Sequence, residues 1–227
     1  LDDGSKMKPY PVFLIGLEEK RCVVAGGGSE AERKVECLLE CDAAVTVISA
    51  EATDRLRHWA DNGTITWIPR EYEHGDLKES TIVIVTGADP VRNERIWKEA
   101  KAEGVLINVM DDVSRCNFIA GSVVRQGPLK IAISTSGCAP ALAVRLRERM
   151  EREFGPEFAD FLNLMEGLRE PLAARYADFE TRRALWYELV DSDVLDRLRE
   201  GRPDLARLRV EEIVGGDAAN GGCADAV

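Results

Sequence analysis

Three consecutive glycines, Gly26, Gly27 and Gly28, stand between a short apolar segment and a helix-forming segment. The spacing Gly26-x-Gly28-x-x-Ala31 matches the dinucleotide-binding pattern, with alanine at the third position. Gly26 permits a tight turn, Gly28 lets a pyrophosphate approach the backbone, and Ala31 lets the helix pack closely on the strand. The pattern predicts a phosphate-binding turn, and a glycine-rich turn in another kind of α/β protein is the alternative.

The acidic residue that holds the ribose hydroxyls is expected about 20 residues after the glycines, at the end of the next strand. Ser49 and Ala50 occupy that place, and Glu51 follows directly. Glu51 either accepts hydrogen bonds from the ribose, which favours NAD, or is only the favourable acid in the first turn of the next helix. The nearest arginine in the sequence is Arg55, so a 2′-phosphate is less favoured.

Apolar segments of strand type alternate with helical segments over the first 110 residues. This alternation predicts a parallel sheet with right-handed crossovers, which is a Rossmann-type α/β domain. The expected strands are 22–25, 44–48, 64–68, 81–85 and 105–109. Ligands bind beyond the carboxyl ends of such strands. That edge also carries the small residues Thr86 and Gly87, where a cofactor has room, and the carboxylates Asp111 and Asp112.

Asp111 directly follows the fifth expected strand and should face the crevice. A partly desolvated carboxylate at that position can act as a general base. The alternative is that Asp111 and Asp112 only end the strand and cap the following turn. The position alone does not separate the two interpretations.

The pattern changes after residue 113. Two short strands are expected at 122–125 and 129–134, joined by the turn Gln126-Gly127-Pro128. Pro140 suits the first position of a helix that runs to 154. Further helices are expected over 157–169, 171–191, 193–200 and 204–213, and 215–227 has the composition of a disordered tail.

The helix after Pro140 carries Arg145, Arg147 and Arg149 among glutamates. Such a run usually forms a solvated, ion-paired helix face. The alternative is a cluster that binds an acidic ligand, because a chain of net charge −11 must meet an acidic ligand with local arginines.

The composition is that of an ordinary globular protein, with 45% hydrophobic and 31% charged residues. The charge of −11 disfavours nucleic acid as a partner, and no segment is apolar enough for a membrane helix. The six cysteines lack zinc spacing and are expected as thiols in a reducing cytoplasm. Neither of the two histidines has a partner at metal-ligand spacing, so no metal site is expected.

Several segments together resemble the precorrin-2 dehydrogenase family, the dehydrogenase and ferrochelatase module of siroheme synthase. They are Tyr10-Pro-Val-Phe-Leu, 22–34, Asn108-Val-Met-Asp111, Cys116-Asn-Phe-Ile, 127–135 and Gly137-Cys-Ala-Pro140. The similarity extends faintly to about residue 190 through Arg182-Arg-Ala-Leu-Trp186. The block Ile-Ala-Ile-Ser-Thr135 is far more specific than the glycine pattern.

The resemblance implies a homodimer that oxidises precorrin-2 to sirohydrochlorin with NAD. It implies a NAD-binding Rossmann domain over 7–112, a dimerisation and substrate segment over 113–154, and a helical domain over 155–214. By this similarity Asp111 is the catalytic residue. By the same similarity Ser29, Glu30, Ala50 and Glu51 contact NAD. Together with the glycine turn and the small residues after the fourth strand, the predicted cofactor residues are Gly26, Gly27, Gly28, Ser29, Glu30, Ala50, Glu51, Thr86 and Gly87.

The tetrapyrrole substrate of this family carries many carboxylates. The resemblance therefore makes Asn108, Thr135, Arg145, Arg147 and Arg149 the candidate substrate-binding residues. Two alternatives to the dehydrogenase alone remain. One is a bifunctional dehydrogenase and ferrochelatase that makes siroheme, and the other is a non-enzymatic NAD-sensing module.

Overall fold

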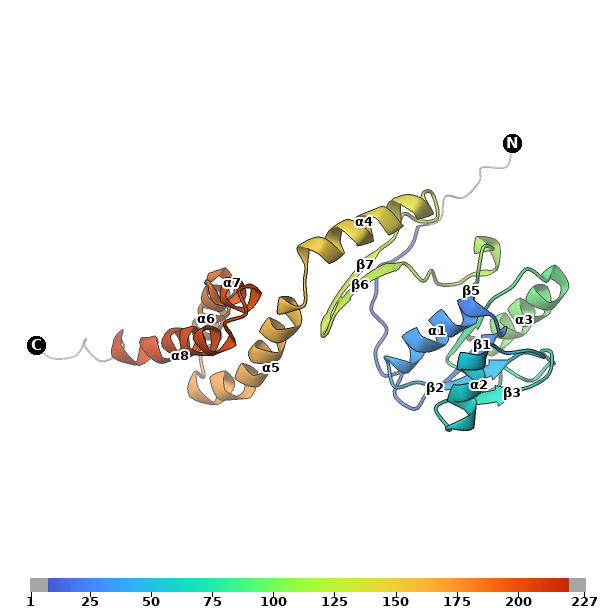
Figure 1. Ribbon diagram of the computed structural model, residues 1–227, viewed down its shortest axis with the longest axis horizontal. Helices are drawn as coiled ribbons and strands as arrows, with labels where there is room; N and C mark the ends of the chain where they lie inside the picture. Colours follow the sequence, from blue (N-terminus) through green and yellow to red (C-terminus); the bar gives the residue numbers. More distant parts are fainter. Residues whose placement is uncertain (1–7, 221–227) are drawn as a thin grey trace, which may run out of the picture. The chain divides into compact units, whose positions relative to one another are not determined.

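The structure is a computed structural model that describes residues 8–220, and it divides into two compact units (Figure 1). The first unit extends to Ala120 and includes Ser136–Cys138. The second unit comprises Gly121–Thr135 and the chain from Ala139 onward. The expected fold class, a Rossmann-type parallel sheet followed by a small strand pair and then helices, is confirmed.

The first unit is built on a five-stranded parallel sheet with the strand order β3-β2-β1-β4-β5. The strands are β1 (Arg21–Ala25), β2 (Ala44–Ile48), β3 (Thr66–Ile68), β4 (Ile82–Val85) and β5 (Leu106–Val109). They alternate with α1 (Ser29–Leu39), α2 (Asp54–Asp61) and α3 (Pro90–Glu103). The order reverses between β1 and β4, and in such sheets this switch point opens the ligand crevice.

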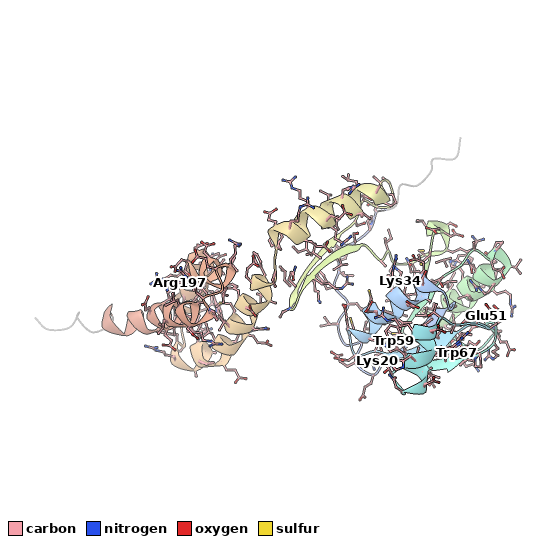
Figure 2. The ribbon with its side chains drawn as sticks, viewed as in Figure 1. Lys20, Lys34, Glu51, Trp59, Trp67 and Arg197 are labelled. Atoms are coloured by element: carbon pink, nitrogen blue, oxygen red, sulfur yellow. The ribbon has the colours of Figure 1, made fainter. Side chains whose placement is uncertain are left out.

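Both faces of this sheet are covered, which explains why its strands are continuously apolar. Cys22 and Val24 of β1 pack in a cluster with α1 and α2, whereas Val23 and Ala25 pack in a second cluster with α3. Trp59 of α2 and the indole of Trp67 lie at the edge of the first cluster (Figure 2). Ala31 is fully buried, so α1 lies close to the sheet as its small side chain predicts.

Residues 113–120 pack with the first unit, although the expected domain boundary put them in the dimerisation segment. Asn117 accounts for this packing, because its Oδ1 accepts from the Ile107 N–H at 2.7 Å and its Nδ2 donates to the Val105 carbonyl at 3.0 Å. The side chain thus continues the hydrogen bonding of β5 beyond the edge of the sheet.

The second unit begins with the antiparallel pair β6 (Ser122–Gln126) and β7 (Leu129–Ile133), and Gly127 takes a positive φ of 55° in the turn between them. The helices that follow are α4 (Pro140–Glu153), α5 (Glu157–Arg175), α6 (Phe179–Asp191), α7 (Val194–Arg199) and α8 (Pro203–Asn220). Buried residues of α5 to α8, including Leu172, Leu185 and Leu189, form the core of these helices.

Two helix boundaries differ from those expected. Pro171 lies inside α5 instead of starting a new helix, and the break comes after Arg175, where Asp178 caps α6 by accepting from the Thr181 N–H at 2.7 Å. Residues 215–220, expected in a disordered tail, continue α8. The rest of that expected tail, 221–227, lies outside the described residues. No helix in the described part of the chain is long and apolar enough to cross a bilayer.

Candidate functional site

The residues that follow the strands lie side by side at one edge of the sheet. Backbone hydrogen bonds link them in turn, from Ser49 N to Ile68 O at 3.3 Å, Gly26 N to Ile48 O at 2.9 Å, Thr86 N to Ala25 O at 2.9 Å, and Met110 N to Val85 O at 3.0 Å. The glycine turn, the end of β2, the Thr86 turn and the segment before Asp111 therefore share the edge that the strand pattern predicts.

The three glycines of the turn differ in what a side chain at each position would contact. Gly26 has a φ of 134°, and a Cβ there would lie 2.1 Å from Thr86 Oγ1. A Cβ on Gly27 would lie 1.8 Å from the Glu51 carbonyl oxygen. A Cβ on Gly28 would meet nothing within 4 Å. The protein itself requires Gly26 and Gly27, whereas Gly28 faces open space that a ligand can approach.

The N-terminus of α1 begins directly at this open space. Gly28 is the N-cap, and no side chain caps the helix. The backbone N–H groups of Ser29, Glu30 and Ala31 have no acceptor among residues 8–220. Free N–H groups and the positive end of the helix dipole form an anion site. Glu30 is held to the side in an ion pair with Arg33 at 3.1 Å.

A cavity of about 620 Å³ opens at the glycine turn, within the usual range for small-molecule sites. The predicted cofactor residues Gly26, Gly27, Gly28, Ala50 and Glu51 line it. Ser29, Glu30, Thr86 and Gly87 are not part of this lining but border it on α1 and on the turn after β4.

Ser49 also lines the cavity, and its Oγ is buried without a hydrogen-bond partner in the described part of the protein. A buried hydroxyl without a partner marks a place where water or a ligand completes the bonding. The open Gly28, the free N–H groups of α1 and this hydroxyl together fit a dinucleotide with its pyrophosphate on the glycine turn.

Three charged residues of the cavity wall escaped the sequence prediction, namely Arg57, Glu71 and Arg92. Arg92 donates from Nη2 to the Thr86 carbonyl at 2.5 Å and so ties α3 to the turn after β4. The sequence signal for Arg92 is its place in the first turn of a helix that follows two small residues, where a long side chain can fold back onto the turn.

Glu71 lies in the loop between β3 and β4. The buried carboxylate of Glu99, a residue of α3, holds this loop to α3. Glu99 is 3% exposed and accepts hydrogen bonds from the Tyr72 hydroxyl and from the Gly75 and Leu77 N–H groups at 2.9 Å each, and its Oε2 lies 2.8 Å from His74 Nδ1. Burial alone would raise the pKa of Glu99, but these donors together hold it below its ordinary value.

Asp111 and Asp112 differ sharply in their surroundings. Asp112 accepts from Ser114 Oγ at 2.5 Å and from the Arg115 guanidinium, and these two contacts lower its pKa. The Asp111 carboxylate is exposed and has no hydrogen bond or ion pair within residues 8–220. Its φ of 61° is in the left-handed region, which costs an aspartate on the order of 1 kcal/mol. Asp112 is thus held within the turn, whereas the Asp111 carboxylate has no partner in the described residues.

The candidate substrate residues fall on both units, and most already have protein partners. Asn108 Nδ2 donates to the Phe118 carbonyl at 3.1 Å, and Thr135 Oγ1 accepts from the Ala139 N–H at 3.2 Å. On α4, Arg145 pairs with Glu148 at 2.8 Å, and Arg147 pairs with Glu151. Arg149 is exposed and has no ion pair in the described part of the chain.

Three family models match consecutive parts of the chain. An NAD(P)-binding family matches residues 13–122, the sirohaem biosynthesis protein central family matches 126–153, and the sirohaem synthase dimerisation region matches 157–213. The three matches together cover most of the chain, and two of them are to sirohaem biosynthesis families. The family resemblance read from the sequence is thereby confirmed, and the first match confirms a cofactor of the NAD type.

Curated relatives agree with this family. Siroheme synthase of Pseudoalteromonas atlantica is 34% identical over 206 residues, which cover 91% of this chain and 44% of the relative. Siroheme synthase 2 of Yersinia enterocolitica is 33% identical over 208 residues, which cover 92% of this chain and 43% of the relative. The chain thus spans less than half the length of these relatives.

Among solved structures, SirC, a precorrin-2 dehydrogenase, superposes with a TM-score of 0.73 at 23% sequence identity. The match covers 90% of this chain and all of that one. The two proteins share a fold.

Proposed function

We propose that this chain is an NAD-dependent dehydrogenase that oxidises precorrin-2 to sirohydrochlorin. The observation that carries the proposal is the pairing, at one edge of the sheet, of a dinucleotide cavity with a free carboxylate, Asp111. The matches to the two sirohaem family models and the fold shared with a precorrin-2 dehydrogenase support the choice of substrate. A sensor of NAD would need the cavity but not Asp111.

Bound NAD supplies the hydride acceptor. The residues of the chain bind and orient it. The free N–H groups of Ser29 and Glu30 bind the pyrophosphate, Glu51 accepts from the ribose, and the Thr86–Gly87 turn leaves room beside β4. A carboxylate oxygen of Asp111 accepts the proton that the macrocycle loses, so that substrate oxidation releases one hydride and one proton in total.

The substrate carboxylates require cations, since the chain as a whole carries a charge of −11. Arg149 supports this role most directly, because it has no internal ion pair in the described part of the chain. Arg145 and Arg147 would exchange weak surface pairs for substrate contacts. Asn108 and Thr135 would contribute through Oδ1 and the hydroxyl proton, which their internal hydrogen bonds leave free.

A homodimer in the cytoplasm is part of the proposal. The match of 157–213 to a dimerisation region supports it, and so do the apolar side chains that this region exposes, such as Phe179, Tyr187 and Val190. Sedimentation of the purified chain tests the dimer, and a monomer at micromolar concentration would contradict it.

The activity is tested by following the absorbance of enzymatically made precorrin-2 with NAD, without metal and then with Fe²⁺ or Co²⁺. Conversion to sirohydrochlorin that requires both the chain and NAD supports the dehydrogenase. Metal insertion in the second arm would add the ferrochelatase. Tight NAD binding without any turnover would favour the sensing module instead.

A further inference from the structure

Helix α2 carries two arginines that the structure treats differently. Arg55 is engaged within the protein, because its Nη2 lies 2.6 Å from Glu36 Oε1 and its guanidinium stacks 4.4 Å from the centre of the Trp59 ring. Arg57 lines the dinucleotide cavity. The nearer arginine in the sequence to the end of β2 is therefore occupied, and the one beyond it reaches the site.

Arg57 is poorly satisfied by the protein. Its one ion pair within residues 8–220 is with Asp54 at 3.4 Å, and the Asp54 side chain is fully exposed to water. Exposed pairs of this kind contribute little free energy. The guanidinium has five N–H donors in a planar fork, and most of them are left for a ligand.

The position of Arg57 on the cavity wall identifies the part of the ligand it faces. Ser49, Ala50, Glu51 and Thr53, which follow β2, line the same cavity, and Arg57 follows Thr53 by one helical turn. The backbone of Arg57 is fixed there, because its N–H donates to the Thr53 carbonyl at 3.0 Å. In a sheet of this strand order the end of the second strand holds the adenosine ribose.

We propose that Arg57 is a specificity-determining residue that binds a 2′-phosphate on this ribose, so that the chain binds NADP as well as NAD. This inference rests on the proposed function. Glu51, exposed and without a partner in the described residues, accepts from the free ribose hydroxyls of NAD. In NADP the phosphate replaces one hydroxyl and is repelled by Glu51, and the Arg57 guanidinium offsets the repulsion through charge-assisted hydrogen bonds.

Calorimetric titration of the whole chain with NAD and with NADP tests the inference. The parental protein should bind both. Arg57→Gln should weaken NADP binding by about tenfold or more and leave NAD binding nearly unchanged. Arg55→Gln is the matched control on the same helix and should leave the ratio of the two affinities unchanged. Glu51→Gln should shift that ratio in the opposite direction, toward NADP.

Three outcomes would overturn the inference. Parental protein that binds NAD but not NADP would remove it and leave the proposed function intact. Arg57→Gln with parental affinity for NADP, or with an equal loss of both ligands at an unchanged melting temperature, would show that Arg57 does not contact the 2′-phosphate. Parental protein that binds neither dinucleotide would overturn the proposed function together with this inference.

Discussion

Substitution of Gly28 by alanine should affect NAD binding with little effect on the stability of the fold. Gly28 has φ −89° and ψ −173°, an extended conformation that alanine adopts freely, and its Cβ would meet no atom within 4 Å. Alanine is a poorer N-cap than glycine, but it also reduces the freedom of the unfolded chain, and these two effects oppose each other. The free energy of unfolding should change by less than about 1 kcal/mol.

The same methyl group stands where the pyrophosphate must approach the backbone. Displacing the phosphate from the N–H groups of α1 costs at least one hydrogen bond to a charged group, which is about 1.5–3 kcal/mol. NAD affinity should therefore fall by about 10- to 150-fold.

Calorimetry with NAD and a thermal melt of the same sample measure the two effects. Gly27→Ala is the contrasting variant, because its Cβ would lie 1.8 Å from a backbone carbonyl oxygen and must disturb the fold itself. It should lose both melting temperature and affinity. Gly28→Ala with parental NAD affinity would refute the reasoning, since the dinucleotide would then not pass over Gly28.

The remaining predictions concern the other parts of the first unit. Asp111→Asn should keep NAD affinity and lower the turnover of precorrin-2 by about 100-fold or more. Asp112→Asn should instead lower the melting temperature and keep the turnover. Equal effects of the two variants on turnover would contradict their separate roles. Glu99→Gln should be less stable than the parent at pH 7. Because the pKa of Glu99 is lowered in the folded state, its ionised form contributes stability above its ordinary pKa of about 4.3, and this contribution is lost as the pH falls through the folded value. The melting curves of parent and variant should converge at low pH, and a constant difference down to acid pH would exclude this role. Arg92→Ala removes the hydrogen bond to the Thr86 carbonyl. The free energy of unfolding should fall by about 1 kcal/mol, which lowers the melting temperature by about 2–4 °C in a calorimetric scan. An unchanged melting temperature would contradict a stabilising role for this hydrogen bond.

The parts of the fold that the sequence predicts correctly are those with a strong repeating physical requirement. A sheet buried on both faces needs unbroken apolar strands, and a continuous β-branched segment such as 81–85 is typical of such a strand. The glycine turn is equally constrained, because Gly26 and Gly27 would clash with the neighbouring strand ends if they carried a side chain. Pro171 misleads because a proline more often begins or ends a helix, yet α5 runs through it.

The position after the fifth strand and the family resemblance single out Asp111 over Asp112, but the sequence does not show how the surroundings of the two aspartates differ. The backbone conformation sets this difference. The left-handed conformation of Asp111 places Asp112, and not Asp111, within reach of Ser114 and Arg115. Asp112 is thereby hydrogen-bonded within the turn, and Asp111 is left without a partner in the described residues.

The charges of the cavity also come from contacts between distant segments. Glu51 and Glu71 line its wall, and Glu30 and Glu32 stand in the first turn of α1, an acidic setting for a ligand that is itself an anion. The overall charge of −11 adds to this repulsion. Binding of the dinucleotide must then depend on the fixed N–H groups of α1, and the acceptance of a 2′-phosphate must depend on Arg57, which does not belong to the glycine pattern. A sequence motif can therefore locate the phosphate site, but the selection of the ligand depends on side chains that only the folded chain brings to it.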